Sequence, residues 1–165
     1  MTKSASVTST ISGPTPIRAS IPSAIFRCCC ALPCWTIWAL IPALEWQARE
    51  TPRRTGIDVG VSSENVDDSL PDDIRTCVYR VVQEDLQNVA RHSGAKHAKI
   101  AVKQLNGTLS LTVEDDGKGF DPKRTKGMGL LGMEERVKQL GGHLEIHSET
   151  TKGTTLRISL PRFFV

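Results

Sequence analysis

Three separated segments of the sequence carry the polar side chains and glycines that could perform chemistry. The first is Gln-Glu-Asp-Leu-Gln-Asn (83–88), in which Glu84 and Asn88 are four residues apart. On a helix this spacing places both side chains on one side, with His92 one turn further on. A carboxylate and an amide oxygen presented together suit a hard cation such as Mg²⁺, which is usually bound by nucleotide phosphates as well as by protein oxygens. The alternative for this segment is a solvated polar helix face.

The second segment, Glu-Asp-Asp-Gly-Lys-Gly (114–119), places carboxylates beside two glycines at the end of an expected strand. Asp115 could accept a hydrogen bond from an exocyclic amine, while Gly117 and Gly119 would let a planar ring approach the backbone. The alternative is an acidic turn. A Ca²⁺ loop is disfavoured because the regular ligand spacing and the closing Glu of such a loop are missing.

The third segment, Gly-Met-Gly-Leu-Leu-Gly-Met (127–133), precedes an expected helix. Glycine-rich backbone at a helix N-terminus offers unpaired N–H groups and a positive dipole end to an anion. Taken alone, a glycine-rich turn of this kind is a weak indication of an anion site, because many proteins contain one. A P-loop is excluded because its sequence is absent, and a dinucleotide-binding loop is disfavoured because no strand directly precedes the glycines. No arrangement of Ser, His and Asp or of Cys and His indicates nucleophilic catalysis.

The elements that must position these segments follow from hydrophobic periodicity. Apolar residues recur every three or four positions from Ile74 to Ala90, which predicts a long helix that starts after Ser69 and ends at Ser93-Gly94. Asn106-Gly107 predicts a hairpin turn. Shorter helices are expected over 40–49, ended by Thr51-Pro52, and over 134–140, and strands over 57–61, 99–104, 109–114, 144–147 and 154–160. This order predicts a two-layer α/β sandwich, with a mixed, mainly antiparallel sheet and helices on one face.

Composition separates an early segment from the rest of the chain. The 165 residues are 39% hydrophobic and 24% charged, as in ordinary globular proteins, which excludes a collagen-like or wholly disordered chain. The net charge of +3 is spread among interleaved acids and bases, so it does not indicate nucleic-acid binding. No acidic residue occurs before Glu45. We therefore expect two parts: residues 1–39, disordered or read out of frame, and a globular domain over 40–165.

The early segment gives little functional information. Residues 1–23 are rich in Ser, Thr and Pro, which is typical of disorder. The apolar stretch 25–44 is long enough for a membrane span, but Arg27 and two prolines interrupt it, and it is a poor match to a signal peptide. Its four cysteines could suggest a metal site, but three are consecutive and no second ligand pair follows, which favours ordinary cysteines.

The genetic code offers another interpretation of the early segment. When the codons for residues 34–39 are read from one nucleotide earlier, they can encode Leu-Leu-Asp-Asp-Leu-Gly. That peptide would run directly into Leu40 in the present frame. The hypothesis is therefore that residues before about Leu40 are an out-of-frame translation, which the nucleotide sequence would test.

Taken in order, the three segments resemble the ATP-binding domain of sensor histidine kinases, whose fold is shared with the Hsp90, MutL and gyrase ATPases. "VYRVVQEDLQNVARHS" (78–93) resembles the N box, and "VEDDGKGFDP" (113–122) the first glycine box. "GMGLLGMEERVKQLGGHLEI" (127–146) resembles the second glycine box of the NarL-type subfamily. The resemblance covers about 40–164 and implies the Bergerat-type ATP-binding fold, with ATP and Mg²⁺ as cofactors.

The resemblance also implies roles for individual residues. Asn88 would bind Mg²⁺, Glu84 would be the catalytic residue near the γ-phosphate, and Asp115 would accept the adenine amine. Asp85 departs from the small residue usual after the N-box Glu, and we expect it to be solvent-exposed. The residues implied in ATP binding are Asn88, His92, Asp115, Gly117, Gly119, Gly127, Gly129, Leu130, Gly132 and Thr154.

The implied activity is a cytoplasmic protein-histidine kinase that works with a dimerisation and phosphoacceptor domain and a NarL-type response regulator. None of the four histidines in the chain has the context of the phosphoacceptor, so we expect the chain alone not to autophosphorylate. Family members commonly carry Leu-Leu-Asp-Asp-Leu-Gly just before the equivalent of Leu40, which suggests an N-terminally truncated or frameshifted kinase, with any membrane attachment in missing upstream segments. The alternatives are a Ser/Thr kinase of the anti-sigma-factor type and a non-catalytic nucleotide-binding remnant.

Overall fold

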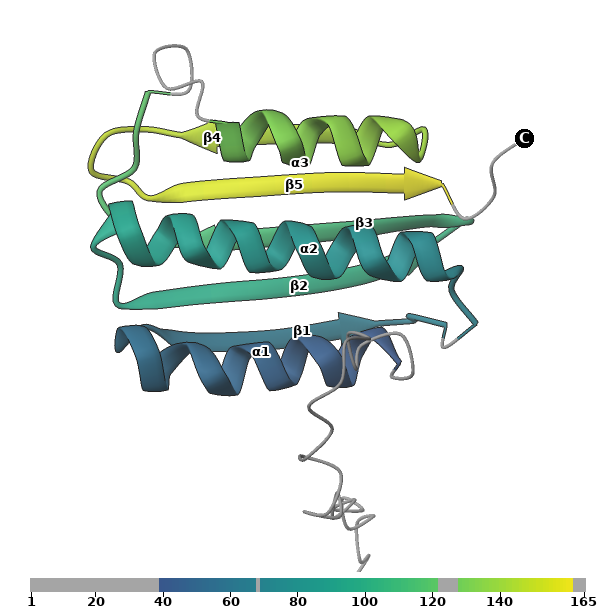
Figure 1. The fold of residues 1–165 in the computed structure, drawn as a ribbon, viewed down its shortest axis with the longest axis horizontal. Helices are drawn as coiled ribbons and strands as arrows, with labels where there is room; N and C mark the ends of the chain where they lie inside the picture. The colour runs from purple at the N-terminus through teal and green to yellow at the C-terminus, as the bar shows by residue number, and fades with distance from the viewer. Residues whose placement is uncertain (1–38, 68, 122–127, 162–165) are drawn as a thin grey trace, which may run out of the picture. The chain divides into compact units, whose positions relative to one another are not determined.

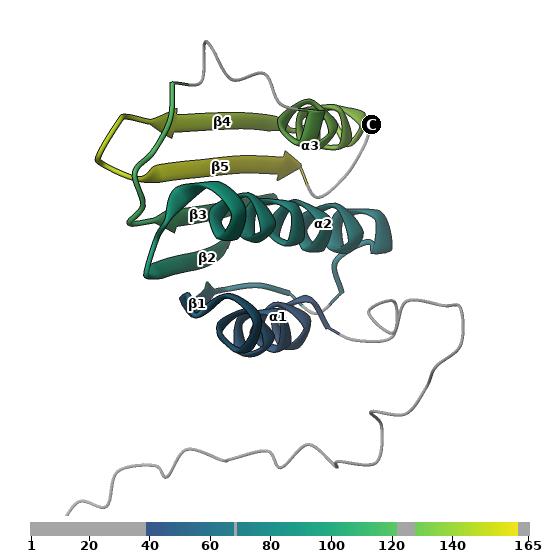
Figure 2. The same ribbon diagram turned by 60° about the vertical axis from the view of Figure 1, so that its left-hand side comes forward.

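The computed structural model describes residues 39–67, 69–121 and 128–161, and all of them belong to one compact unit. Three helices pack on one face of a five-stranded sheet (Figures 1 and 2). The helices are α1 (Leu40–Thr55), α2 (Asp72–Asn88), which continues as a π-helical turn over Val89–Ser93, and α3 (Met128–Gln139). The strands are β1 (Asp58–Glu64), β2 (His97–Leu105), β3 (Thr108–Asp115), β4 (His143–Ser148) and β5 (Thr154–Pro161).

The sheet has the strand order β1-β2-β3-β5-β4. Strand β1 pairs with β2 in parallel, and α2 forms the connection between them, whereas the other three pairings are antiparallel. The β2–β3 hairpin turns at Asn106 and Gly107, which both have positive φ, as the Asn-Gly pair predicts. The predicted two-layer sandwich with a mixed, mainly antiparallel sheet is therefore confirmed.

Alternation along the strands explains why only one face of the sheet is covered. In β2, β3 and β5 every second side chain is apolar and buried beneath the helices, while the intervening residues are mostly polar or exposed. Helix α2 lies centrally over the sheet and buries its apolar stripe against these strands (Figure 2). The buried strand residues are Ala98, Ile100, Val102, Leu109, Leu111, Val113, Leu156, Ile158 and Leu160.

Two helix boundaries differ from the sequence prediction. Helix α1 continues through Pro52 to Thr55 and ends at Gly56, whose φ of 75° is left-handed. In this part of the helix, Thr51 Oγ1 donates to the Gln47 carbonyl and Thr55 Oγ1 to the Thr51 carbonyl. Helix α3 begins at Met128, six residues before the predicted start at 134, so the glycines at 129 and 132 are helical and do not form a loop.

Candidate functional site

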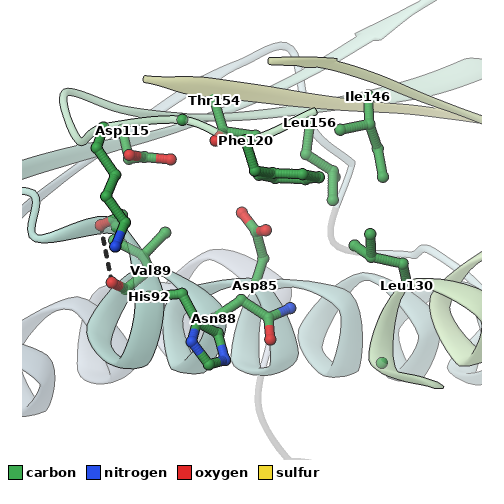
Figure 3. A pocket seen from close by; sticks show the side chains of 14 residues that line it. Asp85, Asn88, Val89, His92, Asp115, Phe120, Leu130, Ile146, Thr154 and Leu156 are labelled. Carbon is green, nitrogen blue, oxygen red and sulfur yellow. Dashed lines mark hydrogen bonds between the residues drawn. The ribbon is translucent and has the colours of Figure 1, made fainter. Parts of the chain in front are cut away.

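A pocket of about 330 Å³ opens between α2 and the sheet, where β3, β4 and β5 meet the loop after β3 (Figure 3). Its apolar wall comes from the π turn after α2, from the start of α3, from β4 and β5, and from that loop. Such a cavity, mostly apolar with a few polar groups, is the usual form of a small-molecule site. The apolar lining residues are Val89, Phe120, Leu130, Ile146 and Leu156.

Asp115 and Asn88 line this pocket from opposite walls. Asp115 is the last residue of β3, and Asn88 is the last α-helical residue of α2 (Figure 3). Asp115 Oδ1 accepts a hydrogen bond of 2.8 Å from the Gly117 N–H, and the carboxyl also accepts bonds from Thr154. Burial raises the pKa of Asp115 above its ordinary value, and the bonds from Gly117 and Thr154 oppose that rise. The pocket therefore holds a fixed acceptor opposite a helix-borne amide.

The loop after β3 is fastened on two sides. On the helix side, the Lys118 N–H donates to the Ser93 carbonyl at 2.9 Å. On the sheet side, the Phe120 N–H donates to Ser148 Oγ at 2.9 Å, and the Thr151 N–H donates to the Lys118 carbonyl at 2.6 Å. These bonds hold the Phe120 ring against the pocket (Figure 3).

The two glycines of this loop are required by close contacts. A Cβ on Gly117 would lie 2.5 Å from the Ser93 Cβ and 2.7 Å from Asp115 Oδ1. Gly119 has a φ of 61°, and a Cβ there would collide with the Glu149 carbonyl. The glycines therefore allow the loop to pack tightly against both the π turn and the β4–β5 turn.

Asp116, next to Asp115, does not line the pocket and instead binds backbone N–H groups at the start of β2. Its Oδ1 accepts bonds from the N–H groups of Lys96 and His97 at 2.8 and 2.9 Å, and its Oδ2 lies 2.7 Å from His97 Nδ1. These hydrogen bonds lower the pKa of Asp116 to about 2. Asp116 thus ties the start of β2 to the end of β3.

The first turn of α3 contacts α2 through Gly129. A side chain at Gly129 would collide with the Glu84 carboxylate, which shows how closely that carboxylate approaches the helix start. Gly129 and Leu130 line the pocket, whereas Gly132 does not and has open space around its Cα. Gly127, also implied in ATP binding, lies outside the described residues.

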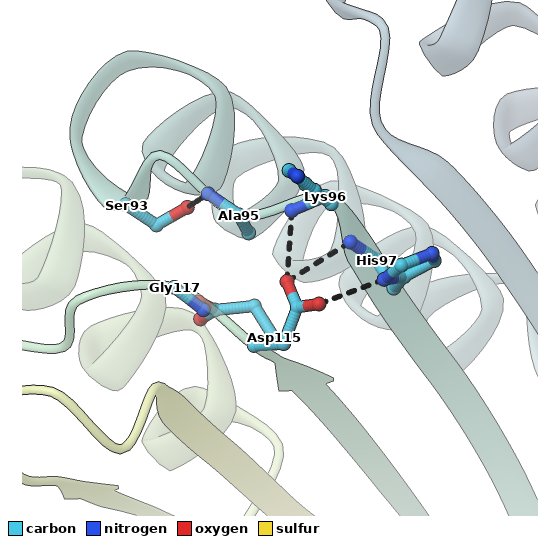
Figure 4. Close-up of polar contacts among 7 residues, drawn as sticks. Ser93, Ala95, Lys96, His97, Asp115 and Gly117 are labelled. Atoms are coloured by element: carbon cyan, nitrogen blue, oxygen red, sulfur yellow. Dashed lines mark hydrogen bonds and ion pairs between the residues drawn. The ribbon is translucent and has the colours of Figure 1, made fainter.

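The π turn after Asn88 gives the helix end an unusual geometry. Residues 89–93 form i→i+5 bonding, and Val89, His92 and Ser93 from this turn line the pocket. Ser93 Oγ donates to the Val89 carbonyl at 2.8 Å. It also accepts from the Ala95 N–H at 2.9 Å (Figure 4). His92 lies on the pocket wall, but its side chain is exposed overall.

Asp85 corrects the sequence prediction. We expected it to be solvent-exposed, but it is only 7% exposed and lines the pocket. Its position explains this, because Val81 and Val89 lie four residues before and after it and are both buried. Asp85 therefore lies on the buried stripe of α2, beside the Glu84–Asn88 face. The recurrence of apolar residues every three or four positions could have predicted this burial.

The structure brings most of the predicted site residues to one place. Asn88, His92, Asp115, Gly119, Gly129, Leu130 and Thr154 line a single pocket, Gly117 and Glu84 lie beside it, and their roles stay predictions. Sequence reasoning missed Ser148, whose hydroxyl contacts Thr154 Oγ1 at 3.1 Å, and also missed the pocket's lining by Lys118, Phe120, Ile146 and Leu156. The alternation of β4 and β5 could have placed the two apolar strand residues on the helix-facing side.

Across the described part of the chain, no three His, Cys, Asp or Glu side chains come together to form a metal site. No helix within residues 39–67, 69–121 and 128–161 combines the length and apolar character needed to cross a membrane.

Sequence comparison decides the family. The family model described as "Histidine kinase-, DNA gyrase B-, and HSP90-like ATPase" matches residues 73–163, more than half of the 165-residue chain. The chain belongs to this ATPase family. The match spans α2, with its π turn, and both glycine-rich segments, so it contains every side chain that lines the pocket.

Among curated relatives, members of this ATPase family that are histidine kinases align with about three quarters of the chain. It is 35% identical over 124 residues to the signal transduction histidine-protein kinase/phosphatase DegS of Brevibacillus brevis, covering 74% of this chain and 32% of that protein. It is 36% identical over 128 residues to the sensor histidine kinase MctS of Rhizobium johnstonii, covering 74% of this chain and 28% of MctS. The chain thus spans about a third of the length of these relatives.

Solved structures share the fold of this ATPase domain. The blue-light activated histidine kinase of Erythrobacter litoralis aligns with a TM-score of 0.65 and 24% identity, over 77% of this chain and 43% of that one. The catalytic domain of the histidine kinase ThkA aligns with a TM-score of 0.56 and 17% identity, over 74% of this chain and 91% of that one. The chain therefore has the fold of a histidine-kinase ATP-binding domain.

Proposed function

We propose that this chain binds ATP with Mg²⁺ and transfers its γ-phosphoryl group to a histidine on a dimerisation and phosphoacceptor domain. The observation that carries the proposal is the placement of Asp115 and Asn88 on opposite walls of one pocket. Asp115 and Asn88 are 27 residues apart in sequence, and the fold brings them close enough to contact the two ends of one ligand. The curated relatives, which are named as histidine kinases, support the same reaction.

The base of the nucleotide fits the apolar part of the pocket. Asp115, held by Gly117 and Thr154, presents a fixed acceptor for the exocyclic amine of adenine. Ile146, Leu156 and the Phe120 ring provide apolar contacts for a purine beside that acceptor (Figure 3). The first turn of α3, with Gly129 and Leu130 on the pocket wall, offers unpaired backbone N–H groups to the phosphates.

The donor set fits Mg²⁺ only as a partner of the nucleotide. Asn88 is half-buried on the pocket wall and has one oxygen ligand to give, and no acidic cluster exists among the described residues to hold the ion alone. Mg²⁺ is commonly bound by one or two protein oxygens and completed by substrate phosphates. Asn88 would hold it, and when bound it would neutralise charge on the phosphate oxygens.

The chemistry needs positioning more than covalent catalysis. In the transfer, an imidazole nitrogen of the acceptor histidine forms a bond to the γ-phosphorus, and the bond to the β–γ bridging oxygen breaks to release ADP. Glu84, on α2 beside the start of α3, would orient the acceptor or take up its proton as the bond forms. His92 and Lys118 would add positive charge or hydrogen-bond donors at the pocket wall.

The acceptor domain and the receiving protein complete the proposal. The phosphohistidine would pass its phosphoryl group to a response regulator of the NarL type, in the cytoplasm, where ATP is supplied. The sequence "GLLGMEERV", within the second glycine-rich segment, supports this subfamily by resemblance.

Labelled ATP tests the proposal. The purified chain is incubated with [γ-³²P]ATP and Mg²⁺, alone and with a supplied dimerisation domain that carries the acceptor histidine. We expect label on the added domain only, lost in acid and retained in alkali, as for phosphohistidine. Acid-stable label on a serine of an added protein would instead support a Ser/Thr kinase. Tight ATP binding without any transfer would support a nucleotide-binding remnant.

A further inference from the structure

The Asp85 carboxyl is buried in the pocket without a partner. The residue is 7% exposed, it lines the pocket, and its side chain points from α2 toward Leu156 and Phe120 on the opposite wall (Figure 3). Within the described part of the chain, no group donates a hydrogen bond to it or forms an ion pair with it, and neither of its oxygens is a fully enclosed atom left without a partner, so the carboxyl group faces the pocket. Its hydrogen bonds are therefore left for a molecule in the pocket, water or a ligand.

The charged surroundings of Asp85 favour its neutral form. Burial, followed by the negative charges of Asp115 across the pocket and Glu84 on the same helix, raises its pKa to about 7. The other titratable groups on the pocket wall, His92 on the π turn and Lys118 on the loop, form no hydrogen bond or ion pair with it among the described residues. A neutral carboxyl group has one O–H to donate.

The chemistry of adenine offers an acceptor to a neutral carboxyl group. The exocyclic amine of adenine carries two N–H donors, and three ring nitrogens, N1, N3 and N7, accept. Asp115 accepts from the amine in the proposed function, and the O–H of a neutral second acid in the same pocket is complementary to a ring nitrogen. Two ionised carboxylates would instead repel each other and the triphosphate.

We propose that Asp85 is a specificity-determining residue of the nucleotide site, whose carboxyl group donates a hydrogen bond to a ring nitrogen of the purine while Asp115 accepts from the amine. This inference rests on the proposed ATP site and assigns it a second base-reading group. The pocket thereby reads the base at two positions, one with an acceptor and one with a donor.

Nucleotide analogues and matched variants test the assignment. Binding of ATP and of its 1-deaza, 3-deaza and 7-deaza analogues, each lacking one ring nitrogen, is measured by calorimetry at pH 6.5. The wild-type chain should bind one analogue about tenfold more weakly than ATP, the loss expected for one hydrogen bond in a buried site. Asp85→Ala should weaken ATP binding by a similar factor and bind that analogue as tightly as ATP.

Two further variants separate base reading from a structural role. Asp85→Asn keeps a donor of similar size, so it should retain ATP affinity within about threefold and still discriminate against the same analogue. Asp58→Asn, an exposed acid at the start of β1, is the matched control and should leave all four affinities unchanged. Should Asp85→Ala fail to fold, the wild-type analogue series and Asp85→Asn still decide the question.

The outcomes distinguish this inference from the proposed function. If the wild-type chain binds all four nucleotides equally, or if Asp85→Ala keeps the discrimination, Asp85 does not read the base, while the ATP site stands. If the wild-type chain binds no ATP, the ATP site itself is wrong and the inference fails with it.

Discussion

Asp115 and Thr154 are register partners at the end of β3 and the start of β5, and the threonine donates hydrogen bonds to the aspartate carboxyl. Thr154 Oγ1 also lies 3.1 Å from Ser148 Oγ, and Ser148 Oγ in turn accepts a bond from the Phe120 N–H. The acceptor for the base is thus oriented by the sheet and by the loop that follows it. This pairing explains why a site carboxylate sits at a strand end, where the ladder fixes its backbone.

Asp115→Asn should weaken ATP binding by about 1–3 kcal/mol, because an amide replaces the charged acceptor and presents N–H groups toward an amine. Isothermal titration calorimetry at neutral pH measures the loss. Glu114→Gln is the matched control, since Glu114 is the preceding residue of β3, is exposed, and lies outside the pocket lining. Equal affinities for Asp115→Asn and the wild-type chain would remove Asp115 from the site.

Thr154→Val should weaken ATP binding by about 0.5–1.5 kcal/mol, because it removes the hydroxyl that orients Asp115 and preserves the side-chain shape. The neighbouring Thr155→Val alters the other side of β5 and should change the affinity little. Fluorescence competition with a labelled nucleotide is sufficient to rank the two variants. A larger effect from Thr155→Val would contradict the orienting role.

Asp85→Asn should stabilise the empty protein, and the gain should grow with pH. The folded-state pKa of Asp85 is about 7 against an ordinary value of 3.8, so the unfolded chain releases this proton first. The free energy of unfolding of the wild-type chain therefore falls as pH rises from about 4 to about 7, and this contribution of Asp85 is constant at higher pH. Urea denaturation at pH 4, 6 and 8 should give a gain of about 1–3 kcal/mol at pH 8 and much less at pH 4. A gain independent of pH would rule out the titration.

Gly132→Ala and Gly129→Ala should have opposite effects on stability, although both glycines lie in α3. An added methyl at Gly132 meets nothing within 4 Å, so the variant should gain about 0.5–1 kcal/mol from helix propensity. The methyl at Gly129 would collide with the Glu84 carboxylate and must displace it. Thermal unfolding compares the two, and a gain for Gly129→Ala equal to that for Gly132→Ala would contradict the close contact.

Asp116→Ala should release the backbone at the start of β2. Hydrogen exchange of the Lys96 and His97 amides should accelerate, because their acceptor is removed, while the Gly117 amide stays protected by Asp115. Wild-type protection of the two amides should persist above pH 4 and fall only as pH approaches 2, where Asp116 becomes protonated. Unchanged exchange at Lys96 would show that another group holds this turn.

The sequence predicted the sheet well because each strand follows a period-two pattern with a recognisable end. The expected strands at 99–104 and 109–114 correspond to β2 and β3, and the hairpin turn lies at the predicted Asn106-Gly107. Local chemistry is sufficient for these features, since alternation sets the face and the turn sets the register. The parallel pairing of β1 with β2 depends on a non-local contact, which periodicity does not encode.

The predictions that failed depend on tertiary packing. Pro52 does not end α1, because the burial of Ala48 and Thr51 against the core holds the helix together on either side of it. Gly129 is helical because α3 packs on α2 at that point, which outweighs its poor propensity. The prediction for Asp85 was wrong because it relied on the residue type. An acidic residue is usually exposed, but the position of Asp85 on the buried stripe of α2 makes it buried.

Helix α1 and strand β1 contribute buried side chains to the core but no residue to the pocket lining. Leu40, Leu44 and Ala48 are buried in the same cluster as α2, and β1 covers the outer edge of β2. A shorter recombinant piece starting at α2 would keep the whole ligand-binding surface yet uncover the part of the apolar core that α1 and β1 cover, and it would leave β2 with unpaired backbone groups. Such a piece should precipitate or self-associate through that bare edge, so the smallest soluble form for crystallisation or spectroscopy begins no later than Leu40.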